Sequence, residues 1–223
     1  MVAMRPKILM IHGGGTTPDI FRIQARKLDA ALSQFFDLHY VSAPIECPAG
    51  PGVLPFFAGM GPFLKWMHDQ PPDLEDLDTF PALDDMLQVF YAEGPFDGIV
   101  AFSQGAKAAL HLLRHLERER GGDRAVDFVI TVCPTCPFQG IKDPKDRRGP
   151  YAKACLALGK VQTESIHVLA SGDPYNYESE SMIEFFEASA RKVFRIEGGH
   201  HMPMDDGFNR KLAEMAARIY NGI

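Results

Sequence analysis

Residues 97–105 read Asp-Gly-Ile-Val-Ala-Phe-Ser-Gln-Gly, an apolar run that ends in a serine held between small residues. Apolar residues at helical spacing follow at once, from Ala106 to Leu116. A strand that turns sharply into a helix at one serine is the layout of a nucleophile elbow, which lifts the hydroxyl of Ser103 above the sheet. Position 101 is alanine where the usual pattern has glycine, so the turn must accept one extra methyl group. The alternative is a serine that only caps the following helix.

Strand-like and helix-like segments alternate along most of the chain. The strand-like runs are 7–12, 38–41, 98–102, 128–133, 166–170 and 193–196, and the helical patterns are 19–35, 82–92, the stretch after Ser103, 179–191 and 205–220. This alternation predicts an α/β fold with a mostly parallel sheet and helices on both faces. A length of 223 residues suits one domain over residues 1–223.

A stretch rich in proline and glycine, residues 43–81, interrupts this pattern. It carries Phe56, Phe57, Phe63 and Trp66, and disordered segments tend to lack such side chains. We predict an inserted, lid-like segment over the carboxyl edge of the sheet, where open α/β sheets bind ligands. Its four aromatic side chains are candidates for lining a substrate pocket, with ordinary packing inside the segment as the alternative.

A serine nucleophile needs a base, and histidine suits neutral pH because its ordinary pKa is about 6.5. His200 and His201 follow a late strand and two glycines, and spacing alone does not choose between them. The third member of a triad orients the imidazole, and Asp173 follows the strand-like run 166–170. Asp205 and Asp206 are rivals, but they stand where a carboxylate favours the start of the last helix. The order serine, aspartate, histidine is that of α/β-hydrolases.

An oxyanion hole requires backbone N–H groups near the nucleophile. The residue after the serine, Gln104, supplies one, and the loop His-Gly-Gly-Gly-Thr at 12–16 supplies another, for which we choose Gly14. A plain glycine-rich turn is the alternative. A phosphate-binding loop is disfavoured because the Gly-Lys-Ser/Thr ending is missing. We expect His12 to pack or hydrogen-bond beneath this loop.

Composition and charge limit the kinds of partner and cofactor that this chain can have. The formal net charge of −6 argues against nucleic acid as a partner, since that calls for a basic face. No apolar stretch approaches the ~20 residues that a membrane span needs, so we expect no membrane partner and a cytoplasmic protein. Cys133 and Cys136 have the spacing of a redox or zinc pair, but two cysteines cannot complete a tetrahedral zinc site. We therefore predict no metal and no cofactor.

With these motifs assembled, the chain resembles the fungal family of serine hydrolases, small α/β-hydrolases that include polyketide-releasing thioesterases. The matching segments are Ile-His-Gly-Gly-Gly-Thr at 11–16, Ser-Ala-Pro at 42–44, Gly-Pro-Phe-Leu-Lys-Trp at 61–66, Ala-Phe-Ser-Gln-Gly at 101–105, Gly-Asp at 172–173 and Gly-Gly-His-His-Met-Pro at 198–203. The resemblance implies Ser103 as nucleophile, Asp173 as acid and His200 as base. Cys-Pro-Thr-Cys at 133–136 departs from the simpler loop expected there.

The resemblance implies hydrolysis of an acyl thioester through an acyl-serine intermediate, with release of a polyketide or other acyl chain from a carrier protein or CoA. The charged run at 142–148 is a candidate dock for an acidic acyl carrier protein, and a solvated loop is the favoured reading of it. A small-molecule carboxylesterase shares every catalytic residue. An acyltransferase or macrolactone-forming cyclase is a further alternative, and a non-catalytic binding protein on the same fold belongs to a different class.

Overall fold

The computed structural model of the chain describes residues 5–67, 82–135 and 159–223. Its main sheet has six strands in the order β2-β1-β5-β6-β7-β8, and every neighbouring pair is parallel. The strands are β1 (Lys7–Ile11), β2 (Asp37–Val41), β5 (Gly98–Phe102), β6 (Phe128–Val132), β7 (Glu164–Ala170) and β8 (Arg191–Ile196). Parallel strands end at the same edge, so the loops that follow β1, β5, β6, β7 and β8 meet there.

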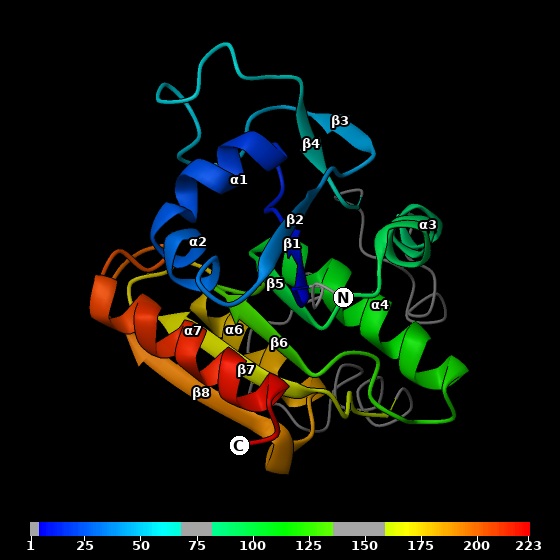
Figure 1. The fold of residues 1–223 in the computed structure, drawn as a ribbon. Coiled ribbons are helices and arrows are strands. Elements are labelled where there is room, and N and C mark those ends of the chain that lie inside the picture. Colours follow the sequence, from blue (N-terminus) through cyan, green and yellow to red (C-terminus); the bar gives the residue numbers. More distant parts are fainter. Residues whose placement is uncertain (1–4, 68–81, 136–158) are drawn as a thin grey trace.

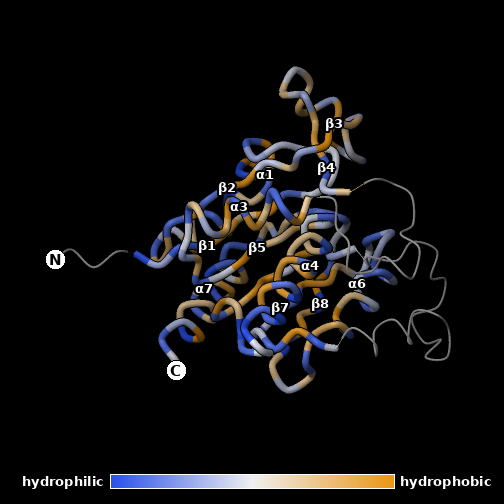
Figure 2. The backbone as a smooth tube through the Cα atoms, turned by 90° about the vertical axis from the view of Figure 1, so that its right-hand side faces the viewer, coloured by the Kyte–Doolittle hydropathy of each residue, from blue (hydrophilic) through white to orange (hydrophobic). Residues whose placement is uncertain are grey.

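Helices cover both faces of this sheet (Figure 1). One face packs against α1 (Pro18–Gln24), α2 (Arg26–Leu32) and α7 (Asp206–Tyr220), and the other against α3 (Leu83–Glu93) and α4 (Gln104–Glu119). After β7 the chain forms α6 (Asn176–Met182) and two short 3-10 helices, η2 (Ile183–Phe185) and η3 (Ala188–Ala190). Hydrophobic segments accordingly gather along the strands and α4 in the interior (Figure 2). The predicted fold class is confirmed.

Alternating residues of the central strands pack into two separate hydrophobic cores, one on each face of the sheet. Ile99 and Ala101 of β5 face the α3–α4 side, whereas Val100 and Phe102 face the α1–α2–α7 side. Period-two alternation sends successive side chains to opposite faces, and all five residues of β5 are buried. A continuous apolar run is the pattern expected of a parallel strand covered on both sides.

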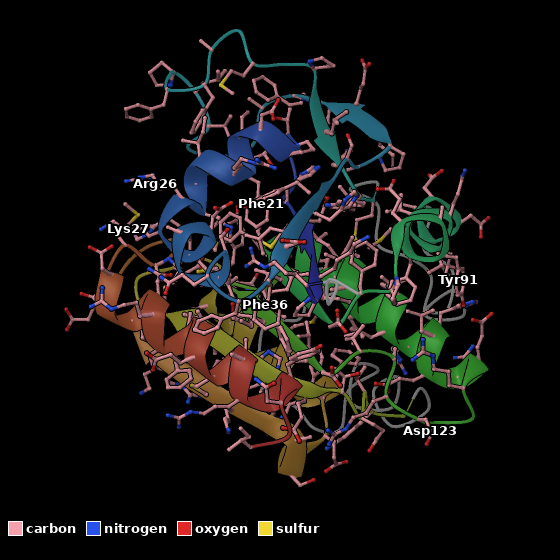
Figure 3. All side chains as sticks on the ribbon, viewed as in Figure 1. Phe21, Arg26, Lys27, Phe36, Tyr91 and Asp123 are labelled. Atoms are coloured by element: carbon pink, nitrogen blue, oxygen red, sulfur yellow. The ribbon has the colours of Figure 1, made fainter. Side chains whose placement is uncertain are left out.

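Two helical predictions were wrong in detail. The pattern over 19–35 forms two helices that break at Ala25, and α2 ends at Leu32. Phe35, which the periodicity placed on the buried stripe, is 40% exposed, and Phe36 takes the buried place after the turn. In Figure 3, Phe21 of α1 and Phe36, in the turn after α2, point toward the strands, while Arg26 and Lys27 of α2 point away from them.

The pattern over 179–191 is also broken up. Helix α6 ends at Met182, and Phe186 has an extended backbone that bridges to Val161. Arg191 already belongs to β8. A hydrogen-bonded bridge to a neighbouring segment therefore overrides the helical periodicity here.

The described part of the predicted insertion, residues 43–67, contains a small antiparallel hairpin of β3 (Ile45–Cys47) and β4 (Phe63–Lys65). This hairpin stands at one end of the molecule in both views (Figures 1 and 2). Residues 68–81 of the insertion lie outside the described residues, and the assignment of 1–223 to one domain stays a prediction. Among the described residues, no helix combines the length and apolarity that crossing a bilayer demands.

Candidate active site

Ser103 stands at a sharp turn between β5 and α4. Its backbone has φ 53° and ψ −121°, a left-handed conformation that few residues other than glycine adopt. Hydrogen bonds hold the turn: the Ser103 N–H donates to the Val132 carbonyl at 3.1 Å, and the Ser103 carbonyl accepts from the Ala106 N–H at 3.0 Å. Strain of this kind persists only where the surrounding structure enforces it, and it gathers at functional sites.

Glycine at position 105 is a geometric requirement of this turn. A Cβ atom on Gly105 would lie 2.5 Å from the His12 carbonyl oxygen and 2.6 Å from that of Ile11. Helix α4 can therefore approach the end of β1 only without a side chain here. Ala101, the departure from the usual pattern, is fully buried in β5 and leaves the turn intact.

The loops after β7 and β8 bring a carboxylate and an imidazole to the same edge. His200 Nε2 lies 2.8 Å from Ser103 Oγ, and His200 Nδ1 lies 2.7 Å from Asp173 Oδ2. With Nδ1–H donating to the carboxylate, Nε2 is free to accept the serine proton. The Tyr175 N–H donates to the other carboxylate oxygen at 2.7 Å. Three predicted residues from distant parts of the chain thus form one hydrogen-bonded row.

Electrostatics favour the ionised carboxylate at Asp173. The Asp173 side chain is inaccessible to solvent, and this burial by itself would raise its pKa. Hydrogen bonds from His200 and from the Tyr175 N–H outweigh it, so the pKa of Asp173 is lowered overall. A charged carboxylate fixes the tautomer of the neighbouring imidazole and stabilises its protonated form.

The structure separates the two adjacent histidines. His201 turns away from Ser103: its Nδ1 donates to the Met202 carbonyl at 2.9 Å, and its Nε2 accepts from the Gly199 N–H at 3.3 Å. Both ring nitrogens of His201 are therefore engaged within their own loop.

The rival carboxylates also have other partners. Asp205 caps α7 by accepting from the Phe208 N–H at 2.6 Å, as the helix-start argument anticipated. Asp206 forms an ion pair with Lys27 at 3.0 Å, which joins α7 to α2. Within residues 5–67, 82–135 and 159–223, neither carboxylate is bonded to an imidazole.

The glycine-rich loop lies against the turn at Ser103. A Cβ on Gly14 would lie 3.0 Å from Gln104 Oε1, and one on Gly13 would lie 3.2 Å from Ser103 Cβ. Within the described part of the chain, the backbone N–H groups of Gly13, Gly14 and Gln104 donate no hydrogen bond. Unsatisfied donors beside a nucleophile can hold a developing negative charge. The choice of Gly14 over Gly13 stays a prediction.

His12 supports this loop from below. It is fully buried; its Nδ1 donates to the Gly13 carbonyl at 2.7 Å, and its Nε2 accepts from the Ala43 N–H at 3.1 Å. Burial lowers the pKa of His12 to about 4, against a smaller opposing effect of the Gly13 hydrogen bond. A neutral His12 therefore packs beneath the loop, where we expected it.

A cleft of about 400 Å³ opens in front of Ser103, with Gly14, Gln104 and His200 in its wall. The four predicted aromatic lining residues lie elsewhere among the described residues. Trp66 is buried in the core, where its indole N–H donates to the His12 carbonyl at 2.7 Å, and Phe56 is 84% exposed. Phe57 and Phe63 are partly exposed and do not border the cleft. The inserted segment reaches the cleft instead through smaller residues such as Pro51 and Val53.

Among the cleft-wall residues that sequence reasoning missed, two stand out. The rings of Tyr175 and His200 pack in a T-shaped arrangement, with their centroids 5.1 Å apart. Tyr175 follows Asp173 by two residues, and its position beside the predicted acid was the available signal. Lys107 is buried at the cleft in the first turns of α4, and it stands out as the one charged residue in the run Gly-Ala-Lys-Ala-Ala-Leu.

Cys133 lies behind the carboxylate. It follows β6 with φ 44°, and burial, together with the charge of Asp173, raises the pKa of its thiol to about 12. Cys133, Asp173 and His200 have potential ligand atoms within 4.8 Å of one another, but the carboxylate and imidazole already bond to each other. Cys136 and the charged run 142–148 lie outside the described residues.

The parallel sheet, the sharp turn at Ser103 and the loops that converge on it define an α/β-hydrolase. Solved α/β-hydrolase structures share this fold: Arabidopsis thaliana SOBER1 superposes with a TM-score of 0.62 at 14% identity, over 97% of this chain and 99% of that one. A Bacillus cereus carboxylesterase gives a TM-score of 0.56 at 18% identity, over 96% and 89% of the two chains. The family model described as "Serine hydrolase (FSH1)" matches residues 1–212, and the chain belongs to this family.

Two relatives illustrate the family. Esterase FUS5 of Gibberella fujikuroi is 34% identical over 220 residues, which cover 97% of this chain and 88% of the relative. Thioesterase FSL2 of Gibberella zeae is 32% identical over 217 residues, which cover 89% and 86% of the two chains. Membership of a serine hydrolase family supports hydrolase activity toward an ester-type substrate.

Proposed function

We propose that this protein hydrolyses acyl thioesters or esters through an acyl-serine intermediate, with Ser103 as nucleophile, His200 as base and Asp173 as the group that orients the base. The observation that carries the proposal is the hydrogen-bonded row from Asp173 through His200 to Ser103, at 2.7 and 2.8 Å. Nucleophile, base and orienting acid within hydrogen-bond reach are the signature of an activated serine.

In the first step, His200 Nε2 takes the hydroxyl proton as Ser103 Oγ attacks the substrate carbonyl. The carbonyl oxygen becomes an oxyanion, which the N–H groups of Gly14 and Gln104 stabilise by hydrogen bonding. His200 then returns the proton to the leaving thiol or alcohol, and the acyl group stays on Ser103. In the second step, His200 deprotonates water, which attacks the acyl-enzyme, and His200 then returns that proton to Ser103 Oγ as the bond to the acyl group breaks and the acid leaves.

The finer proposal is release of a polyketide or related acyl chain from a carrier-protein thioester. Its thioesterase part is supported by the relative FSL2, a thioesterase. A small-molecule carboxylesterase is the second candidate, favoured by the relative FUS5, whose name is esterase. Both activities use the same three side chains, so the leaving group alone separates them.

A fluorophosphonate probe tests the catalytic assignment, because it reacts only with an activated serine. We expect labelling of the wild-type protein at Ser103 and none of Ser103→Ala. Wild-type protein that resists the probe, and that also hydrolyses no acyl substrate, would favour a binding protein on a hydrolase fold.

A substrate panel tests the finer assignment. Acyl thioesters of graded chain length are compared with oxygen esters of the same acyl groups, beside Ser103→Ala. A thioesterase shows the higher kcat/KM on the thioester of each pair. Much faster cleavage of the oxygen esters would overturn the thioesterase proposal and leave the serine hydrolase proposal standing. Mass spectrometry of the products separates hydrolysis from acyl transfer or cyclisation.

A further inference from the structure

The inserted segment makes a dense set of hydrogen bonds to the glycine-rich loop. The Leu64 carbonyl accepts from the Gly15 N–H at 2.8 Å, and the Leu64 N–H donates to the Thr16 carbonyl at 2.8 Å. The Gly50 N–H donates to the Gly15 carbonyl at 2.9 Å. Residues 43–67 thus hold the outer end of the loop by main-chain pairing, and we call them the strap.

Two further bonds reach the inner end of the loop and the turn at Ser103. Trp66 Nε1–H donates to the His12 carbonyl at 2.7 Å, and the Trp66 backbone N–H donates to Gln104 Oε1 at 2.8 Å. Trp66 is only 1% exposed, and its indole bond to His12 is buried, whereas its bond to Gln104 is partly buried beside the cleft. One residue therefore ties the start of the glycine-rich loop to the first residue of α4.

These contacts converge on the atoms that matter for the oxyanion. Gly13 and Gly14 lie between the tied residues His12 and Gly15, and their N–H groups are left free of partners among the described residues. The remaining donor is the backbone N–H of Gln104, whose side chain is the one that Trp66 holds. A close fit completes the arrangement, since a Cβ on Gly15 would lie 2.2 Å from the Gly50 nitrogen.

We propose that Trp66 and Gln104 are positioning residues of the oxyanion hole. In this proposal the strap fixes the distance between the two donors of the hole, the backbone N–H groups of Gly14 and Gln104. The inference rests on the proposed function, and it gives the insertion a role other than lining an acyl pocket. Preorganised donors stabilise a transition state only if they are already in place when the charge develops. An error of about 1 Å in such placement can cost about 100-fold in rate.

Trp66→Phe tests the proposal because it keeps a buried ring and removes the indole N–H. We expect kcat to fall about 10- to 100-fold with KM within about twofold of wild type, since the contact acts on the transition state. Tyr40→Phe is the matched control. It also deletes one donor from an aromatic ring, the Tyr40 hydroxyl bonded to Asp29 at 2.7 Å, at a place away from the cleft. We expect its kcat to stay at the wild-type value.

An alkylboronic acid supplies a second readout that loss of folded protein does not mimic. Its boron accepts the Ser103 oxygen and becomes a tetrahedral anion, which places an oxygen in the oxyanion hole. We expect the inhibition constant to rise in Trp66→Phe by the same factor as kcat/KM falls. Gln104→Met, which keeps the backbone N–H and the side-chain length, is expected to act in the same direction by about three- to tenfold. It also provides the test if Trp66→Phe does not fold.

The outcomes separate the two proposals. If folded Trp66→Phe or Gln104→Met keeps the wild-type kcat and the wild-type affinity for the boronic acid, the positioning role is overturned and the proposed function stands. If kcat falls equally in Tyr40→Phe, the positioning role is also overturned, because such a fall indicates a general loss of stability. A wild-type protein that neither hydrolyses acyl substrates nor binds the boronic acid refutes the proposed function, and the positioning role with it.

Discussion

Two buried histidines predict that mild acid destabilises this fold. His12 lies beneath the glycine-rich loop and His167 lies within β7, and both side chains are fully buried. Burial lowers the pKa of His12 to about 4 and that of His167 to about 3, where the nearby charge of Arg191 adds a smaller effect. In the unfolded chain both imidazoles return to an ordinary pKa of about 6.5.

The sign follows from proton linkage. Below about pH 6.5 the unfolded chain binds protons that the folded chain excludes, so the free energy of unfolding falls as the pH drops. Each imidazole contributes a slope of about 1.4 kcal/mol per pH unit until its folded-state pKa is reached. At about pH 4.5 both together remove about 5 kcal/mol, against a typical total of about 5–15 kcal/mol. The stability is therefore fully present above about pH 6.5 and largely lost near pH 4.

Urea unfolding measures this directly, with the fluorescence of Trp66, the single tryptophan and a buried one, as the signal. In the structure, Thr131 Oγ1 bonds to His167 Nδ1 at 2.8 Å. His167→Gln removes the titrating imidazole and keeps a polar side chain beside Thr131. We expect its free energy of unfolding to depend on pH less steeply, by about 1.4 kcal/mol per unit between about pH 6 and 4.5. A wild-type stability that is flat over this range, or parallel curves for wild type and His167→Gln, would refute the reasoning.

Three further predictions concern the site and its supports. His200→Ala should lower kcat by several orders of magnitude, whereas His201→Ala stays within about tenfold, and the reverse ranking in steady-state assays would assign the base to the wrong histidine. Gly105→Ala should abolish activity or soluble expression, because its Cβ would sit 2.5 Å from a backbone carbonyl; an active, folded variant would contradict the close-approach argument. Asp205→Ala should cost about 1 kcal/mol in urea unfolding through the lost helix cap, with kcat unchanged. A large drop in its kcat would point to a direct role for that carboxylate.

The sheet and the three candidate catalytic residues were accessible from the sequence because each depends on local pattern. The strand 98–102 is a continuous apolar run with a serine at its end, and the predicted and observed bounds coincide. Ser103, Asp173 and His200 each follow a strand of a parallel sheet. The sheet topology alone then brings them to one edge.

The role of the insertion was not accessible, because it depends on contacts between distant segments. Aromatic composition indicated that residues 43–81 pack, but it does not say against what. Trp66 bonds to His12, which lies 54 positions earlier in the chain. It also bonds to Gln104, which lies 38 positions later. Similarly, periodicity placed Phe35 in the core, but the end of α2 at Leu32 turned that position outward.

β8, the strand that precedes the loop of the proposed base His200, lies at the border of the main sheet as far as the described residues show. Among the described strands β8 pairs only with β7, and its exposed residues are Lys192 and Arg195, the latter bonded to Glu180 at 2.9 and 2.7 Å. Such charges discourage another chain from adding to the open side. A border strand can also detach before the centre melts. On mild heating, the protein should therefore lose its catalytic activity while most of its secondary structure remains. Cooling should restore the activity.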